Sequence, residues 1–321
     1  MDRRSAIALL GALLLGVGNA EAETAYPERP VTIIVPFAAG GQTDAAARIL
    51  AEGLQKELGK PFIVDNRTGA GGIVGTQVVA AARPDGYMLV IGGPSTLVTQ
   101  PLLMKSANYD VKKNFVPVAM FAAAPMLLVV NADSQFKSLA GLIEAGRSRE
   151  LTYGSSGVGS SMHLGTEWFK GLTGVRALHV PFRGSAQSLP ALLSRDIDLL
   201  IDPPITALPL VEEGKLRALA VTAQTSDPKL AGIPTMSDAG ARGYEQLIWN
   251  SLMAPAGTPN EILDKLDRAV RKVLADPQLS ARLQSLSLPA EYRDRDAFAS
   301  FLDQESARYV KIIQDNHIVI K

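Results

Sequence analysis

The chain contains no cysteine and carries no net charge, since 32 basic side chains balance 32 acidic ones over 321 residues. Without cysteine there can be no disulfide, thiol nucleophile, iron–sulfur cluster or lipid attached through sulfur. A nucleic-acid-binding protein needs an excess of basic residues to neutralise phosphates, and none is present. We therefore expect no nucleic-acid partner and a function that uses neither thiol chemistry nor a basic surface.

Long apolar runs are also scarce, and the one near the start of the chain is short. It extends from Ala6 to Val17, which is too few residues to span a bilayer permanently. Arg3-Arg4 precedes it and Ala20-Glu21-Ala22 follows it, in the order expected of a signal peptide with its cleavage site. We interpret residues 1–22 as a signal peptide cleaved near Ala22, which predicts a soluble periplasmic protein. A short N-terminal helix is the alternative, and the export route, Sec or twin-arginine, stays open.

The next segments alternate between strand and helix patterns. Residues 31–36 (VTIIVP) form a β-branched apolar run typical of a strand buried on both faces. Apolar residues then recur at helical spacing from Thr43 to Leu58, and Gly59 ends that helix. Strand and helix patterns recur in 61–66, 76–82 and 87–93. This succession favours right-handed βαβ units and a mainly parallel sheet.

A second series of strand and helix patterns begins near Pro125 and continues to about residue 222. Two α/β halves are more economical than one very large sheet. We expect a first crossover at 115–125 and a second within 222–255. The predicted fold is therefore α/β, with two mixed or parallel-sheet Rossmann-like domains joined by hinge strands. The predicted divisions are domain 1 at 23–124 with part of 250–321, and domain 2 at 125–249.

Glycine-rich loops follow two of the predicted strands and open helices. One is Pro36 to Asp44 and the other is Tyr153 to Ser161, one in each half of the chain. Backbone N–H groups at a helix start are unpaired and the helix dipole adds positive potential, so such loops bind anions without basic side chains. Facing each other across a cleft, they would suit a carboxylate. A tight turn at Gly40-Gly41 with Asp44 as a helix cap is the alternative for the first loop.

Two further residues lie at the ends of predicted strands. Arg183 follows the strand pattern ALHVPF, and a guanidinium at that end of a parallel strand faces the crevice of the sheet. Asp202 ends the pattern DIDLLID and points to the same edge, where capping of the Pro203-Pro204 turn is an equal alternative. His163 lies just after the second glycine loop. Contact with a ligand is one alternative for this residue, and a capping or packing role is the other.

Motifs for catalysis, metals and cofactors are missing. Ser156 would need glycine at position 158 for a nucleophile elbow, and valine stands there. The glycines at 69–75 lack the spacing and the later acidic residue of a dinucleotide site. The three histidines have no metal-binding spacing, and we read His179 and His317 as structural or exposed. We therefore expect no cofactor, no metal and no enzyme activity; an exported serine hydrolase using Ser155 or Ser156 with His163 is the less favoured alternative.

Eight ordered segments together resemble one known family. They include VPFAAGGQTDAAAR (35–48), VDNRTGAGGIVGT (64–76), LTYGSSGVGSSMHL (151–164) and HVPFRGSA (179–186). The chain resembles the Bug/TctC family, the extracytoplasmic solute receptors of tripartite tricarboxylate transporters, over its whole mature length. The resemblance implies a type II periplasmic-binding-protein fold that closes on a small carboxylate without catalysis. Phe182, the run 200–204 and the run 93–96 depart from the family pattern, so the ligand cannot be copied from a relative.

The resemblance also implies the site and the partners. The ligand is held by loops of both domains, and the residues carried over by motif are Phe37, Ala39, Gly40, Gly41, Gln42, Asp44, Ser95, Ser155, Ser156, Gly157, Ser160, His163, Arg183, Gly184 and Asp202. We expect a monomer that delivers a carboxylic acid, dicarboxylate or amino acid to the integral membrane permease subunits of the transporter. A sensory adaptor that presents its bound ligand to a membrane sensor is the alternative function.

Overall fold

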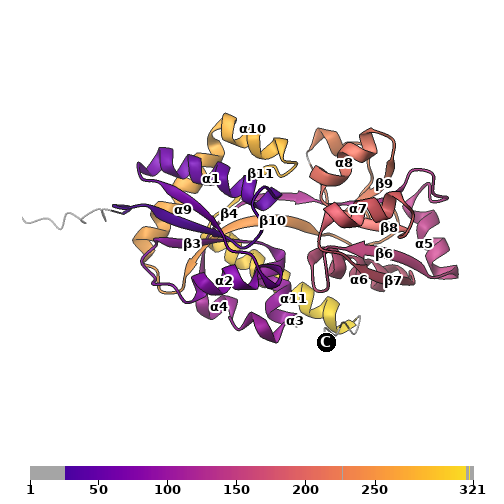
Figure 1. Ribbon diagram of the computed structural model, residues 1–321, viewed down its shortest axis with the longest axis horizontal. Coiled ribbons are helices and arrows are strands. Elements are labelled where there is room, and N and C mark those ends of the chain that lie inside the picture. The colour runs from indigo at the N-terminus through magenta and orange to yellow at the C-terminus, as the bar shows by residue number, and fades with distance from the viewer. Residues whose placement is uncertain (1–25, 226, 316–317, 319–321) are drawn as a thin grey trace, which may run out of the picture.

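The structure is a computed structural model that describes residues 26–225, 227–315 and 318, so the predicted signal peptide and His317 lie outside the described residues. Its strands form two separate sheets, and each sheet with its helices makes one lobe (Figure 1). The first lobe contains the sheet ordered β11-β4-β10-β3-β1-β2, and the second contains the sheet ordered β7-β6-β8-β5-β9. The predicted α/β class with two sheets is confirmed.

The first lobe is built from both ends of the described chain. Its strands are β1 (Val31–Val35), β2 (Phe62–Asn66), β3 (Met88–Gly92), β4 (Phe115–Pro125), β10 (Leu247–Pro255) and β11 (Ala290–Arg293). Its longer helices are α1 (Gln42–Leu58), α2 (Ile73–Ala80), α9 (Asn260–Ala275), α10 (Pro277–Ser285) and α11 (Arg295–Asp315). Its short helical turns are η1 (Ala70–Gly72), η2 (Ser95–Thr99), α3 (Gln100–Leu103), η3 (Lys105–Ala107) and α4 (Val111–Asn114).

The second lobe comes from one continuous stretch. Its strands are β5 (Leu127–Asn131), β6 (Leu151–Ser155), β7 (Ala177–Pro181), β8 (Leu199–Asp202) and β9 (Leu216–Val221). Its helices are α5 (Leu139–Ser148), α6 (Ser161–Thr173), α7 (Ser185–Leu193), α8 (Pro204–Glu212) and the turn η4 (Pro228–Leu230). β5 (LLVVN) and β8 (LLID) are buried along their whole length, and their sequences are apolar up to the last residue rather than alternating.

Both sheets are mixed, which is one of the two sheet types predicted, although the βαβ succession alone favoured mainly parallel pairing. β1 lies parallel to β2 and β3, whereas β10 is antiparallel to both β3 and β4. In the second lobe β6 is parallel to β7 and β8, and β5 is antiparallel to β8 and β9. The antiparallel strands are those next to the two passages between the sheets. A strand that enters a sheet from the other lobe runs in the direction opposite to that of the neighbouring strand. The local sequence pattern does not reveal this direction.

The chain passes between the lobes at β4–β5 and again between β9 and β10, within the two predicted crossover segments. β4 and β10 pair along their length, from Leu247 opposite Pro125 to Pro255 opposite Phe115, and Figure 1 shows them running together toward the second lobe. Where they meet it, the buried Thr222 hydroxyl accepts the N–H of Met126 at 2.7 Å and donates to the carbonyl of Gln246 at 2.6 Å. One side chain thus joins both passages.

Helix α11 adds a third link between the lobes. In Figure 1 its last turns extend beneath the paired strands toward α6. The Gln246 amide, next to the second passage, donates to the hydroxyl of Tyr309 at 3.0 Å and to the carbonyl of Ser161 at 2.7 Å. Arg308 donates to the carbonyl of Glu245 at 2.9 Å. The C-terminal helix of the first lobe therefore holds the first residue of α6.

Candidate functional site

The first glycine loop is shaped by Asp44. Its carboxylate accepts the N–H of Gly40 at 2.9 Å and the amide of Asn66 at 2.9 Å, and it pairs with Arg48 at 3.0 Å. Burial alone would raise the pKa of Asp44, but hydrogen bonds from Arg48, Gly40 and Asn66 lower it below its usual range. The sequence predicted Asp44 as a ligand contact, but the bonds of its carboxylate are to Gly40 of the loop, Arg48 of α1 and Asn66 of β2. Asn66 also donates to the carbonyl of Phe37 at 3.0 Å, so the loop is braced at both ends.

The start of α1 is open to an acceptor. Gly41 precedes the helix, and no side chain caps its first N–H groups. Residues 38–41 are exposed, which includes Ala39 and Gly40, while the Gln42 amide is turned away to the carbonyl of Leu286 at 2.9 Å. The backbone donors of the first turn therefore remain available to an anion, as the sequence predicted for this loop.

Segment η2 lies against the first glycine loop and is largely absent from the predicted site. A Cβ on Gly72 would lie 2.8 Å from Thr96 and 3.3 Å from the ring of Phe37, so the three residues are packed together. Ser95, the one predicted residue here, is partly buried at the start of η2. Gln100 donates to the carbonyl of Gly71 at 2.6 Å. The glycines at 71 and 72 therefore pack against η2 and the residue that follows it. These segments are 20 or more residues apart, and no local sequence pattern predicts their contact.

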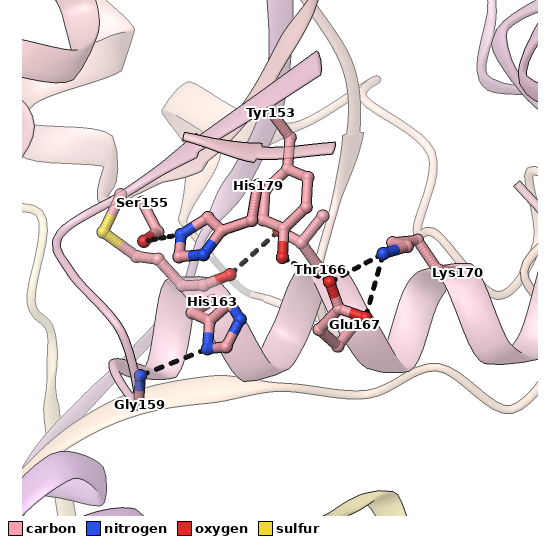
Figure 2. A network of polar contacts seen from close by, with 9 residues as sticks. Tyr153, Ser155, Gly159, His163, Thr166, Glu167, Lys170 and His179 are labelled. Carbon is pink, nitrogen blue, oxygen red and sulfur yellow. Dashed lines mark hydrogen bonds and ion pairs between the residues drawn. The ribbon is translucent and has the colours of Figure 1, made fainter. Parts of the chain in front are cut away.

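Ser155, in the second glycine loop, is fully buried. Its Oγ lies 2.6 Å from Nε2 of His179 and accepts the N–H of Gly157 at 3.1 Å, as Figure 2 shows for the histidine contact. The sequence pairs this serine with His163 in the hydrolase alternative, whereas the structure pairs it with His179. Of the two alternatives for His179, structural or exposed, the structure favours the structural one, because the side chain is partly buried and lies within this polar network.

Two histidines and a tyrosine stack behind this loop (Figure 2). The rings of His163 and His179 are 4.1 Å apart, and those of His179 and Tyr153 are 4.9 Å apart. Burial lowers the pKa of His163, and burial together with the neighbouring His163 lowers that of His179 to about 4. The Tyr153 hydroxyl donates to Glu167, which also pairs with Lys170 at 2.7 Å. Both imidazoles are therefore neutral at pH 7 and serve as hydrogen-bonding groups.

The remaining predicted residues of this loop fall into two groups. Ser160 caps α6 by accepting the N–H of His163 at 3.2 Å, so its hydroxyl is engaged in the helix start. Ser156 and Gly157 are partly buried, and Val158 between the turns is 49% exposed. The loop is thus tightly organised from within, and its outward-facing part is short.

The start of α7 provides a second open helix terminus. Gly184 precedes the helix with a φ of +143°, no side chain caps the first turn, and a Cβ at Gly184 would meet nothing within 4 Å. Arg183 is exposed beside it, with its main-chain N–H bonded to Gln187 at 3.2 Å. Since β7 ends at Pro181, Arg183 does lie just beyond the carboxyl end of a parallel strand. Arginine and open backbone donors together make a site for a carboxylate.

Asp202 lies close to this terminus but is enclosed. The residue has no exposed surface, and its carboxylate accepts the hydroxyl of Ser185, the first residue of α7, at 2.6 Å and that of Thr206. Burial raises its pKa to about 6, although these two hydroxyls act to lower it. Asp202 therefore ties α7 to α8 and fixes the position of the α7 start. Neither predicted alternative, a ligand contact or a cap of the Pro203 turn, describes these bonds.

The lobes meet directly where η2 approaches the second glycine loop. The Thr99 hydroxyl of the first lobe donates to the carbonyl of Gly159 in the second at 2.8 Å, in a fully buried contact. The N–H of Gly159 in turn donates to Nδ1 of His163 at 3.1 Å. Segment η2, which contains Ser95, thus contacts the second glycine loop at the interface between the lobes.

The chemistry of this region favours binding over catalysis. Within the described part of the chain, no group of three or more acidic or histidine side chains could hold a metal ion, and no helix is long and apolar enough to cross a membrane. Ser155 is buried and its histidine partner is a weak base.

Two α/β lobes joined by paired strands, each with a helix start that no side chain caps, are the architecture of a two-lobed solute-binding protein. Residues 46–318 match the family model of the tripartite tricarboxylate transporter family receptor. The chain belongs to this family, the Bug/TctC solute-binding receptors, and the resemblance seen in the sequence is confirmed.

Relatives agree over nearly the whole chain. Protein BugT of Bordetella pertussis is 32% identical over 326 residues, which cover all of both chains. A solved structure described as R. palustris Rpa4515 with adipate is 37% identical, with a TM-score of 0.82 over 92% of this chain and 99% of that one. MatC from Rhodopseudomonas palustris with bound malate is 32% identical, with a TM-score of 0.79 over 90% of this chain and all of that one.

Proposed function

We propose that this protein is a periplasmic receptor that binds a small organic carboxylate between its lobes and delivers it to the permease of a tripartite tricarboxylate-type transporter. Its relatives of known structure hold adipate and malate, both dicarboxylates. The proposed signal peptide at residues 1–22 supplies the export step. The protein acts by binding alone, as a monomer, with no cofactor.

The observation that carries the proposal is a pair of helix starts, among those without a side-chain cap, that lie behind a glycine in each lobe: α1 behind Gly41 and α7 behind Gly184. One belongs to each lobe, and each follows a strand of its sheet. Unpaired N–H groups and the helix dipole attract a carboxylate without any basic excess in the whole chain. Ser160 already caps α6, so we assign the second lobe's direct contacts to Gly184 and Arg183.

The other predicted site residues then have supporting roles. Asp44 shapes the first loop, Asp202 fixes the start of α7, and Ser155 with His163 shapes the second loop. Closure between lobes would bury the carboxylate, where each hydrogen bond to the charged group contributes roughly 1.5–3 kcal/mol. We place the two domains as predicted, at 23–124 with part of 250–321 and at 125–249, with the hinge where Thr222 joins both passages.

A thermal-shift screen with a carboxylate panel tests this function. The protein is first unfolded and refolded to remove any acid acquired during expression, and the panel includes adipate, malate, short monocarboxylates and amino acids. A ligand at about 100 times its dissociation constant stabilises the native state by about 2.7 kcal/mol, which raises the melting temperature measurably. Neutral diols of the same length are the matched controls. The proposal fails if no acid raises the melting temperature more than its diol.

A further inference from the structure

Gly159 is the only residue of the second glycine loop, among those the structure describes, whose main chain bonds both to the other lobe and to a ring. Its carbonyl accepts the Thr99 hydroxyl across the interface at 2.8 Å, and its N–H donates to Nδ1 of His163 at 3.1 Å. Its φ of +78° is a left-handed conformation that favours glycine. The orientation of the carbonyl that meets Thr99 thus depends on a residue held by His163.

This arrangement requires a neutral imidazole at position 163. Because Gly159 donates to Nδ1, that nitrogen must carry a lone pair, and the single ring proton is placed on Nε2. A doubly protonated ring would present an N–H to the N–H of Gly159. Two donors cannot form a hydrogen bond, and their dipoles repel each other at that separation.

The titratable neighbours of His163 come from three elements. They are Tyr153 of β6, His179 of β7, and Glu167 and Lys170 of α6 itself. Segment η2, on the other side of Gly159, contributes the non-titrating Thr99. Helix α11 also packs on α6, where Arg308 lies 5.8 Å from the Trp168 ring and pairs with Glu305.

Burial lowers the pKa of His163, and among the charged groups Glu167 raises it while Lys170 lowers it. Glu167 is itself paired with Lys170 and bonded to Tyr153, so its charge is largely compensated. The ring is therefore neutral around pH 7 and gains its proton only in acid, below its usual range.

We propose that His163 is a positioning residue for lobe closure, which sets the Gly159 main chain so that Thr99 can latch the lobes together, and that its protonation releases the latch. This extends the proposed receptor function, since closure is the step that retains a ligand. His163 itself makes no contact with the ligand. Acid conditions then weaken retention through the latch, without any change at the helix starts that hold the carboxylate.

Four single substitutions separate the latch from general packing. Thr99→Val removes the hydroxyl and keeps the shape, and Thr99→Ser keeps the hydroxyl. His163→Leu removes the acceptor for Gly159, whereas His163→Asn places Oδ1 where Nδ1 lies and cannot titrate. The two conservative variants are the matched controls for the other two.

Lobe closure can be measured directly, because the chain has no cysteine of its own. Lys60 in the first lobe and Ala140 in the second are exposed and far in sequence from the latch, so Lys60→Cys and Ala140→Cys accept a pair of spin labels. Distance distributions are recorded at pH 7.5 and 4.5, without ligand and with saturating adipate or malate. The populations of shorter and longer distances give the closure equilibrium.

We expect Thr99→Val and His163→Leu to lower the closure equilibrium at pH 7.5 by about fivefold, the factor carried by one ordinary hydrogen bond of about 1 kcal/mol. Thr99→Ser and His163→Asn should close as the parent does. Acid should open the parent but not His163→Asn, and this comparison removes the titration of the ligand itself. The latch is overturned if Thr99→Val closes like the parent, if His163→Asn opens in acid as much as the parent, or if no shorter distance is populated at pH 7.5.

The test separates the latch from the proposed function. If no acid of the panel binds, the receptor proposal fails, while the label distances without ligand still report on Thr99 and His163. If acids bind but the four variants have equal closure, the receptor proposal stands and the latch fails.

Discussion

The hydroxyl of Thr222 lies 2.7 Å from the main-chain nitrogen of Met126, and this bond ties together the two passages of the chain between the lobes. The same hydroxyl donates to the carbonyl of Gln246 at 2.6 Å, and the Thr222 N–H donates to the carbonyl of Met126 at 2.9 Å. All of this occurs at a residue with no exposed surface. The hinge region is therefore a small buried network in which the Met126 N–H and the Gln246 carbonyl both bond to one side-chain hydroxyl.

Replacement of this threonine should destabilise the whole protein. In Thr222→Val, the Met126 N–H loses its acceptor and the Gln246 carbonyl loses one donor. Both groups are buried, so the loss costs about 2–3 kcal/mol of unfolding free energy. Urea unfolding followed by far-ultraviolet circular dichroism measures the loss. Thr222→Ser keeps both bonds and should lose about 1 kcal/mol, the contribution of one buried methyl group. A Thr222→Val variant as stable as the parent would show that the hydroxyl contributes nothing.

Asp202 gives the folded protein a specific dependence on pH. Burial raises its folded pKa to about 6 from 3.8, so the protonated form is favoured in the native state. The stabilising contribution is complete below pH 3.8 and is lost as the pH rises through 6. At about 1.4 kcal/mol per pKa unit, the full change is about 3 kcal/mol at most.

Asp202→Asn removes this dependence and keeps a neutral polar group between Ser185 and Thr206. We expect the difference in unfolding free energy, parent minus variant, to fall by about 3 kcal/mol at most between pH 4 and pH 7.5. Urea titrations of both proteins at several pH values measure it. Parallel stability profiles would mean that Asp202 titrates in the native state as it does in the unfolded chain.

The sequence predicts most strands because they are short apolar runs, whereas β10 and the charged β11 (AEYR) were not predicted. Residues 115–125, expected as the first crossover, form β4 over the same residues. The pairing of β10 between β3 and β4 was not predicted, since it joins residues more than 120 positions apart and leaves no local periodicity. Partner choice in a sheet is a tertiary property, and it made both sheets mixed.

The roles of the site residues were harder to predict than their positions. Asp44 lies in the glycine loop as expected, but its bond to Asn66 comes from another strand. His179 alternates in a strand like any half-buried residue, and only the fold brings it within 2.6 Å of Ser155. In the sequence Thr99 is an ordinary polar residue, and only the fold shows its hydrogen bond to the second lobe. The sequence identifies candidate loops, whereas which of them meet, and through which hydrogen bonds, requires the coordinates.

Ser155 should not react as a nucleophile. It has the serine–histidine proximity of a hydrolase, but the residue is fully buried and the His179 pKa of about 4 makes that ring a weak base. We expect no labelling of the refolded protein by a fluorophosphonate probe at pH 7.5. Ser156→Ala and Ser155→Ala are the controls that would locate any signal. Labelling that disappears only in Ser155→Ala would instead support the hydrolase alternative.

Arg183 should contribute to ligand affinity without contributing to stability. Its side chain is exposed beside the open start of α7, so Arg183→Ala removes a charged donor but leaves no cavity. We expect the dissociation constant of the best acid of the panel to rise about tenfold, the equivalent of about 1.4 kcal/mol, with an unchanged melting temperature of the free protein. Lys60→Ala, which removes an exposed cation from the first lobe away from the helix starts, is the matched control. Isothermal titration calorimetry measures both, and equal affinity of the two variants would remove Arg183 from the site.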